Sequence, residues 1–384
     1  MLRRSNDRIL DVTGLEIAFP PRQPWKAALE KKFSRGTARH CTIVHWAVTQ
    51  FRSGENGAVR TQVEASSWEN SLMVLATQKP LVGVLSTPAR RSSKFVAATL
   101  LAVALGGCAW LDSKQRELAL RPSPARPDEI TELRPGDLRF TVPVASATAD
   151  IQQLALWWLP HPDPNAPTLL YLHGTFRNLY RNRPKIDALR DAGFAIVAVD
   201  YRGWGESTSI VPSEATIVAD AWLAWAELVR RQPDAGKRVI FGHSMGGAVA
   251  VALASQLRHG ADYGALVLES TFTRLPDVAA VAGFWGSVGA AVTTLDFDAL
   301  SKIGNVDAPV LMLHGADDRT VPIELGRRLR DAARPGVRWI EVPGGSHSRL
   351  HSEAPGLYRQ AMRDLMSDLA PPASTTAPAS ATTR

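Results

Sequence analysis

The sequence contains very little cysteine: Cys41 and Cys108 are the only two among 384 residues. Two thiols in so long a chain exclude a scaffold held by disulfides and a zinc site built from several cysteines. Each of the two therefore needs an explanation of its own. The hydrophobic fraction of 45% and the charged fraction of 21% are those of an ordinary globular protein.

The chain has a formal charge of +7, but most of its length lacks this basic excess. Residues 1–107 contain 15 basic and 7 acidic side chains, whereas residues 108–384 contain 29 basic and 30 acidic ones. The net charges of these two parts are therefore +8 and −1. A nucleic-acid partner requires a basic surface on the folded part of a protein. The sequence beyond residue 107 therefore predicts no nucleic-acid partner.

A short apolar run at residues 95–105 separates these two parts. It follows a basic cluster at residues 90–94 and precedes Gly106, Gly107 and Cys108, which is the order of a secretory signal. The ending Leu-Gly-Gly-Cys resembles the lipobox of bacterial lipoproteins, in which the cysteine is acylated and becomes the mature N-terminus. We therefore expect a palmitate-type anchor at Cys108 that binds the membrane. The expected location is the bacterial cell envelope, on the periplasmic side of a membrane, with the outer membrane favoured.

Two other interpretations of the apolar run remain open. Extended to residue 111 it has about seventeen residues, the lower limit for a transmembrane helix, so it could be an uncleaved anchor. It could also be a buried core helix, although the two glycines would end such a helix badly. A signal has to lie near an N-terminus, so we expect translation to begin further in, at Met73 or nearer Arg90. A cytoplasmic extension before a signal-anchor is the alternative.

Strand and helix patterns alternate after residue 136. Apolar runs predict strands at residues 138–144, 151–159, 168–173, 194–200, 238–243, 265–270, 309–314 and 338–343, and helical patterns lie at 178–192, 214–231, 245–258, 322–334 and 354–369. Short, uniformly apolar strands separated by helices indicate an α/β fold with a mostly parallel sheet covered on both faces. Such sheets place their functional sites at the carboxyl ends of the strands.

Composition predicts how the remaining chain is divided. Residues 111–136 contain four prolines and many charges, which is typical of a tether, and the last residues are rich in Pro, Ala, Ser and Thr. We expect an over-called start or disordered extension at 1–89, a lipoprotein signal peptide at 90–107, a tether at 108–136, one α/β domain at 137–370 and a disordered tail at 371–384.

The strand at 238–243 runs into the sequence Gly242-His243-Ser244-Met245-Gly246. G-x-S-x-G between a strand and a helix is the nucleophile elbow, a turn so sharp that the neighbours of the serine lack side chains. It exposes the hydroxyl of Ser244, and the N–H of Met245 points to the same space. The pattern alone occurs by chance in roughly one chain in ten of this length. The strand and helix on either side make it specific.

A serine hydroxyl attacks only when a base takes its proton, and the base needs an orienting carboxylate. In this type of fold the chain order is serine, acid, histidine. Asp317 and Asp318 follow the strand at 309–314, and His347 lies in a glycine-rich loop after the last strand. Glu269 is an alternative acid and His351 an alternative base.

These motifs together resemble the α/β-hydrolase superfamily over residues 165–369, and in particular the serine aminopeptidase-like and BEM46-like hydrolases with a small lid. The family motif H-G-x-x-D-x-x-V-P carries the catalytic acid at its fifth position, which implies Asp318. The family's G-x-x-H loop implies His347 as the general base. The resemblance also implies that the N–H of Thr175, in the sequence HGT, joins that of Met245 in the oxyanion hole.

Other parts of the resemblance concern structure. The sequence DYRGWGES at residues 200–207 matches a family signature that forms a turn near the site. His173, His243 and His314 lie in tight turns and are predicted to be structural. The segment at about 271–305 leaves room for a small lid. Four of its apolar residues either form a rim for acyl chains or pack the lid onto the sheet: Phe272, Phe284, Trp285 and Val288.

The predicted reaction is acyl transfer to water by a serine hydrolase that cleaves carboxylic esters or thioesters through an acyl-enzyme. Ser244 would be the nucleophile, His347 the base and Asp318 the acid that orients the base. No metal or organic cofactor is implied, and we expect a monomer that acts on a small-molecule acyl substrate. An aminopeptidase-like amide hydrolase, a haloperoxidase- or lyase-like use of the same residues and a non-catalytic envelope lipoprotein remain alternatives.

Overall fold

The computed structural model describes residues 106–107, 109–124, 133–145, 150–281 and 293–369. The compact unit of interest begins at Ala109. The predicted signal at 90–107, apart from its last two residues, and Cys108 itself lie outside the described residues. So do the predicted tail at 371–384 and three of the predicted lid residues, Phe284, Trp285 and Val288.

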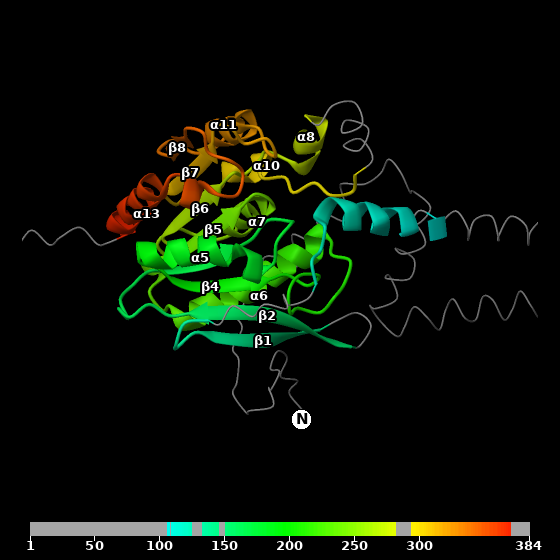
Figure 1. Ribbon diagram of the computed structural model, residues 1–384, viewed down its shortest axis with the longest axis horizontal. Coiled ribbons are helices and arrows are strands. Elements are labelled where there is room, and N and C mark those ends of the chain that lie inside the picture. The colour runs from blue at the N-terminus through cyan, green and yellow to red at the C-terminus, as the bar shows by residue number, and fades with distance from the viewer. Residues whose placement is uncertain (1–105, 108, 125–132, 146–149, 282–292, 370–384) are drawn as a thin grey trace, which may run out of the picture. The chain divides into compact units, whose positions relative to one another are not determined.

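A single eight-stranded sheet forms the centre of the unit (Figure 1). Its strands are β1 (Leu138–Ala145), β2 (Ile151–Leu159), β3 (Thr168–Leu172), β4 (Ala195–Asp200), β5 (Arg238–His243), β6 (Ala265–Glu269), β7 (Val310–Gly315) and β8 (Arg338–Val342). Their order in space is β1-β2-β4-β3-β5-β6-β7-β8. β2 runs antiparallel to β1 and β4, and every other neighbouring pair is parallel. The predicted mostly parallel sheet is confirmed, because all eight expected strands form.

Helices cover both faces of the sheet, as Figure 1 shows. One face packs against α6 (Glu214–Arg231), α7 (Met245–Ala254) and α11 (Ile323–Asp331), and the other against α5 (Leu179–Ala192) and α13 (Pro355–Leu369). Within β3, Leu170 and Leu172 belong to the first core, whereas Leu169 and Tyr171 belong to the second. Both sets of side chains are thus buried, which is why the parallel strands have continuous apolar sequences.

The helix α5, which follows β3 in the chain, has clear boundary signals in its sequence. Asn178 is its N-cap, and the Asn178 side chain accepts a hydrogen bond from the N–H of Arg181 at 3.2 Å. Gly193 ends the helix with a φ of 122°, a conformation that favours glycine. These caps fix where α5 begins relative to the end of β3.

The segment predicted as a tether differs in the structure. Residues 109–120 form a helix, and the side chain of Leu120 is completely buried in the core. Arg116 donates to the carbonyl of Pro212 at 3.2 Å, and Pro124 pairs with Gly205 in an isolated β-bridge. The start of the predicted tether therefore packs on the α/β unit. Composition averaged over 111–136 hid this helix, because all four prolines lie after it.

Short helices were not expected from the sequence. α8 (Leu275–Ala280), α10 (Leu300–Ile303) and α12 (Leu350–Glu353) have too few residues to show a helical period. α8 and α10 lie in the predicted lid, where Phe272 packs into the core with 2% of its surface exposed. Of the two interpretations of Phe272, the structure supports packing. In the described ranges no helix combines the length and the apolar character needed to cross a bilayer.

Candidate active site

Ser244 lies in a strained turn between β5 and α7. Its φ of 54° and ψ of −122° are unusual for a residue with a side chain, and such strain costs about 1–3 kcal/mol. A Cβ on Gly242 would lie 2.3 Å from the carbonyl oxygen of Gly246, and one on Gly246 would lie 2.1 Å from that of Leu172. Both glycines are therefore required by close backbone contact. The structure has the predicted elbow.

The elbow is tied to the neighbouring strand. The N–H of Ser244 donates to the carbonyl of Glu269 at 2.9 Å, and the carbonyl of Ser244 accepts from the N–H of Gly247 at 2.9 Å. Met245 is the first residue of α7, so its N–H has no partner within the helix. These contacts hold the strained turn in place and leave a backbone donor beside the serine.

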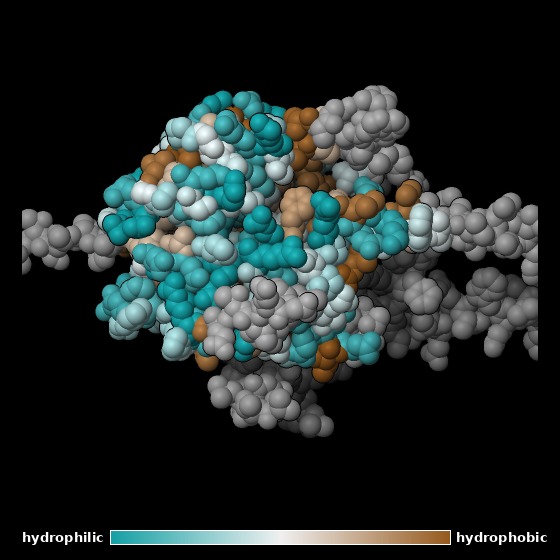
Figure 2. Space-filling view, viewed as in Figure 1, coloured by the Kyte–Doolittle hydropathy of each residue, from teal (hydrophilic) through white to brown (hydrophobic). Residues whose placement is uncertain are grey.

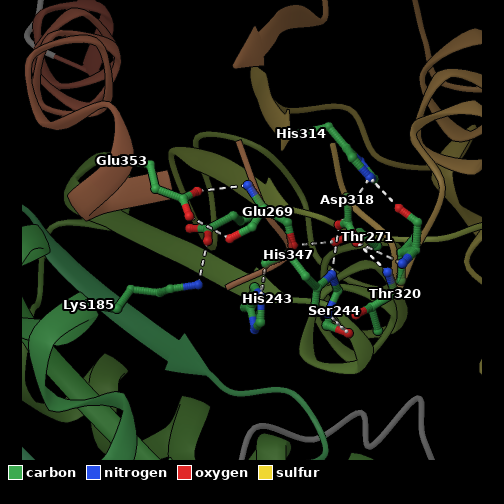
Figure 3. Close-up of polar contacts among 12 residues, drawn as sticks. Lys185, His243, Ser244, Glu269, Thr271, His314, Asp318, Thr320, His347 and Glu353 are labelled. Atoms are coloured by element: carbon green, nitrogen blue, oxygen red, sulfur yellow. Dashed lines mark hydrogen bonds and ion pairs between the residues drawn. The ribbon is translucent and has the colours of Figure 1, made fainter. Parts of the chain in front are cut away.

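His347 joins Ser244 to Asp318 (Figure 3). Its Nε2 lies 3.0 Å from the Ser244 Oγ, and its Nδ1 lies 2.7 Å from Oδ2 of Asp318. With Nδ1–H donating to the carboxylate, Nε2 is free to accept the proton of the serine hydroxyl. The three side chains come from the ends of β5, β7 and β8 and are all buried. The structure thus brings the three predicted residues together.

Asp318 is held as a carboxylate by hydrogen-bond donors. Burial opposes its ionisation most strongly of any single cause, but the hydrogen bond and charge of His347 and the N–H groups of Val321 and Thr320 together lower the pKa of Asp318 below its ordinary value. The N–H groups of Val321 and Thr320 donate to its other oxygen at 2.8 and 2.9 Å. Asp317, its neighbour, is exposed. The geometry therefore selects Asp318 from the two adjacent aspartates.

Two further histidines support this arrangement. Nε2 of His243 lies 2.9 Å from the carbonyl of His347, and burial lowers the pKa of His243 well below its ordinary value. His243 is therefore neutral at neutral pH and can donate to that carbonyl, which fixes the loop that carries His347. Nε2 of His314 lies 2.9 Å from the carbonyl of Val321. Burial lowers the pKa of His314 as well, and both residues hold backbone, as predicted.

The alternative acid has other partners. Glu269 is completely buried at the end of β6, where its carboxylate pairs with the ammonium of Lys185 and accepts from the hydroxyl of Tyr358 at 3.0 Å. Figure 3 shows Lys185 and Glu269 to one side of His347 and Asp318 to the other. The alternative base, His351, packs its ring against that of Tyr358. Among the described contacts, the side chains of Glu269 and His351 form no hydrogen bond to the side chain of His347 or of Ser244.

The loop after β3 contains Thr175, the other predicted oxyanion donor. Its backbone carbonyl accepts a hydrogen bond from Nε1 of Trp204 at 2.7 Å, and Trp204 is completely buried. A Cβ on Gly174 would lie 3.1 Å from the Cβ of Ser244, so this loop runs directly beside the serine. Residues 200–207 were predicted only to form a turn, and the hydrogen bond made by Trp204 was not predicted. A tryptophan between two glycines was the available signal.

Asp200, at the end of β4, also holds the loop that follows β3. Its Oδ1 accepts from the N–H of Leu179 at 2.9 Å and lies 3.4 Å from Nε2 of His173. Burial raises the pKa of Asp200, although His173 and the N–H of Leu179 oppose that shift. A Cβ on Gly205 would lie 1.9 Å from the Asp200 carboxylate, which explains the second glycine of the turn. His173 is thus a packing and hydrogen-bonding residue.

In the part of the chain that the structure describes, no three or more His, Cys, Asp or Glu side chains lie close enough together to bind a metal ion.

Sequence comparison places the chain among known proteins. Residues 163–295 match the family described as serine aminopeptidase, S33. The uncharacterized protein Rv2307c of Mycobacterium tuberculosis is 33% identical over 260 residues, which cover 66% of this chain and 87% of that protein. The lysophosphatidylserine lipase ABHD12 of Danio rerio is 31% identical over 194 residues, covering 47% of this chain and half of that protein.

Structural comparison gives the same fold. The esterase Pf2001 of Pyrococcus furiosus has a TM-score of 0.50 and 18% identity, and the match covers 63% of this chain and 95% of the esterase. The sheet order, the serine elbow between β5 and α7, and the sequence relatives agree with one another. The chain belongs to the α/β-hydrolase superfamily and is an α/β-hydrolase enzyme.

Proposed function

We propose that this protein is a serine hydrolase that cleaves carboxylic esters through an acyl-enzyme intermediate. One observation carries the proposal: a continuous set of short contacts runs from the Ser244 hydroxyl through His347 to Asp318, at 3.0 and 2.7 Å. A serine in a strained elbow, a neutral imidazole and a buried carboxylate are the parts that acyl transfer requires.

The proposed reaction has two halves. Ser244 Oγ attacks the carbonyl carbon of the ester while its proton moves to Nε2 of His347, and Asp318 stabilises the imidazolium that forms. The N–H groups of Thr175 and Met245 hold the oxyanion of the tetrahedral intermediate. His347 then protonates the leaving oxygen as its bond to carbon breaks, which gives the acyl-enzyme and free alcohol. Water repeats the sequence and releases the acid.

Esters are favoured over amides by the relatives whose names state an activity. Those from Danio rerio and Rattus norvegicus are named lysophosphatidylserine lipases, at 31% identity over 194 and 195 residues. A lipase acts on ester bonds. Because this chain spans about half the length of those lipases, their substrate does not transfer with the name. The family description as an aminopeptidase keeps amide hydrolysis as the alternative.

The experiment compares esters with amides of the same acyl group. Purified enzyme is assayed with p-nitrophenyl esters of increasing acyl length and with the matching p-nitroanilides. We expect the esters to be hydrolysed faster at every length, and Ser244→Ala to lower kcat by about 10³-fold or more. Faster anilide hydrolysis would support the amidase instead, and full ester activity in Ser244→Ala would contradict a serine mechanism.

We also propose that Cys108 is acylated and anchors the enzyme to a bacterial membrane. The helical segment 109–120 follows Cys108 directly and exposes Trp110, Leu111 and Leu118 by 63%, 62% and 76% of their surface. Figure 2 shows hydrophobic side chains over this segment. An apolar surface next to an acyl chain suits a bilayer interface. Palmitate labelling should occur in the wild type and disappear in Cys108→Ala, and labelling of the variant would contradict the anchor.

A further inference from the structure

A small cavity with a basic lining is formed by two segments that adjoin residues of the candidate active site along the chain. Its volume is about 250 Å³, and it is lined by residues between 177 and 185 and by residues 348, 349, 351 and 352. The first segment begins two residues after Thr175, and the second begins one residue after His347. The cavity is thus formed by continuations of the oxyanion loop and of the histidine loop.

The lining has an excess of positive charge. It includes Arg177, Arg181, Lys185 and Arg349, and no acidic side chain. Lys185 is neutralised by Glu269, and Arg349 pairs with Glu353 at 3.1 Å. Within the described ranges, neither Arg177 nor Arg181 forms an ion pair, and both are exposed. Two guanidinium groups therefore face this region without a protein counter-ion.

The position of these arginines runs against helix electrostatics. Arg177 lies just before the N-cap of α5 and Arg181 lies in the first turn, which contains no acidic residue. The N-terminal end of a helix carries partial positive charge, so cations there are unfavourable and anions are favourable. Asn182 donates to the carbonyl of Arg177 at 3.0 Å, which fixes the backbone before the helix. Unfavourable cations at the N-terminus of a helix whose backbone is held by hydrogen bonds are expected where a protein binds a ligand.

Size and chemistry indicate which part of an ester enters the cavity. Pockets for whole organic ligands measure about 300–1,000 Å³, so this one suits a small polar group and not an acyl chain. On the proposed mechanism, Nε2 of His347 must reach the leaving oxygen. The alcohol part therefore lies on the side of the histidine loop, which is the side of the cavity. Nδ1 of His351 is buried there without a hydrogen-bond partner in the described structure.

We propose that this cavity binds a negatively charged group, a phosphate or a carboxylate, on the alcohol part of the ester. Arg177 and Arg181 would contact the anion, because a guanidinium binds both kinds of oxyanion through two parallel hydrogen bonds. The proposal rests on the proposed ester hydrolysis and names its substrate class: acyl esters with an anionic leaving alcohol. The two arginines would then act in specificity, by raising kcat/KM for anionic esters.

The test uses esters that share one short acyl group and differ only in the alcohol. Butanoyl esters of glycerol, glycerol phosphate, glycerate and choline supply a neutral, a phosphate, a carboxylate and a cationic leaving group. We expect at least one anionic ester to exceed the glycerol ester in kcat/KM by about 10-fold, and the choline ester to be the poorest. The phosphate and carboxylate arms show which oxyanion the cavity prefers. Equal values for the anionic and neutral esters would overturn the proposal.

Variants locate the effect. In Arg177→Gln/Arg181→Gln the ratio of kcat/KM for the preferred anionic ester over the glycerol ester should fall by about 10-fold. Arg258→Gln is the matched control, because Arg258 is an exposed arginine beyond the far end of α7, and there the ratio should stay the same. A ratio unchanged in the double variant would contradict the role of these arginines.

Two further measurements keep the outcomes distinct. Arg177→Lys/Arg181→Lys keeps the charge and should retain part of the preference, which a purely structural role would not predict. Inorganic phosphate should inhibit hydrolysis of a p-nitrophenyl ester competitively in the wild type and about 10-fold more weakly in the double glutamine variant. If neutral esters are hydrolysed through Ser244 but no anionic preference exists, the inference fails while the proposed function stands. If no ester is hydrolysed, the proposed function itself fails.

Discussion

Two buried carboxylates lie near the ends of neighbouring parallel strands: Glu269 is the last residue of β6, and Asp318 lies three residues after β7. Asp318 accepts from two backbone N–H groups and from His347, and it faces the serine through that histidine. Glu269 is neutralised by Lys185 and bound by Tyr358. The same chemical group at the same edge of the sheet thus has different roles. The partners of a carboxylate, and not its place at a strand end, therefore decide whether it can act in catalysis.

Removing the charge of Asp318 should give the largest effect on activity. Asp318→Asn leaves an amide that cannot hold the imidazole in the required tautomer, so kcat for a p-nitrophenyl ester should fall by about 10⁴-fold. Asp317→Asn is the control, since Asp317 is exposed, and its kcat should stay within about 2-fold. Comparable losses in the two variants would mean that the structure assigns the wrong aspartate.

At Glu269, the other carboxylate, we expect a change of its partner to affect stability. Lys185→Met leaves the Glu269 charge buried and uncompensated, which should lower the free energy of unfolding by about 3–5 kcal/mol. The double variant Lys185→Met/Glu269→Gln should regain much of this stability, because no unpaired charge remains. Urea denaturation of both variants measures the difference. If Lys185→Met is as stable as the wild type, the Lys185–Glu269 pair does not stabilise the fold.

A smaller effect is expected from the residue that holds the oxyanion loop. Trp204→Phe removes the hydrogen bond to the carbonyl of Thr175 and leaves that buried carbonyl without its donor. We expect kcat to fall by about 10-fold, which is less than the 10²–10³ that loss of an oxyanion donor costs, because the donor is displaced and not removed. KM should change little. An unchanged kcat would show that the loop is held by other contacts.

The smallest effect concerns stability as a function of pH. The folded pKa of Asp318 lies below its ordinary value, so its ionised form stabilises the fold at higher pH, and this contribution is lost as the pH falls through the folded pKa. The difference in unfolding free energy between wild type and Asp318→Asn should therefore be constant above about pH 5 and shrink as the pH falls below about 4. Urea denaturation at each pH measures it, and a difference that grows on acidification would contradict the assigned direction.

Much of the fold could be predicted because strands that are buried on both faces of the sheet have recognisable apolar sequences. Most of the parallel strands have apolar runs, and Ser244 and Asp318 each follow such a run, whereas His347 follows the more polar strand β8. Strand ends of a parallel sheet meet at one edge, so three local patterns predict one site. The family motif distinguished Asp318 from Asp317, and the hydrogen bonds of Asp318 explain why the second aspartate is suited to the role.

The contacts that could not be predicted join residues without a local pattern. Lys185 and Glu269 are 84 residues apart, and Trp204 and Thr175 are 29 apart. A lysine in a helix and a glutamate at the end of a strand give no sign in the sequence that they will be buried together. The helix at 109–120 was missed for another reason, since its short proline-free stretch was averaged with the prolines that follow it.

In the proposed mechanism, Ser244 is the nucleophile that His347 activates. The most direct measurement is to treat the full-length enzyme with a fluorophosphonate probe and identify the modified residue by peptide mass spectrometry. We expect one phosphonylated residue, Ser244. Labelling should be lost in Ser244→Ala and slowed by about 10³-fold or more in His347→Ala. Labelling at another residue, or labelling of Ser244 at the same rate in the histidine variant, would contradict this mechanism.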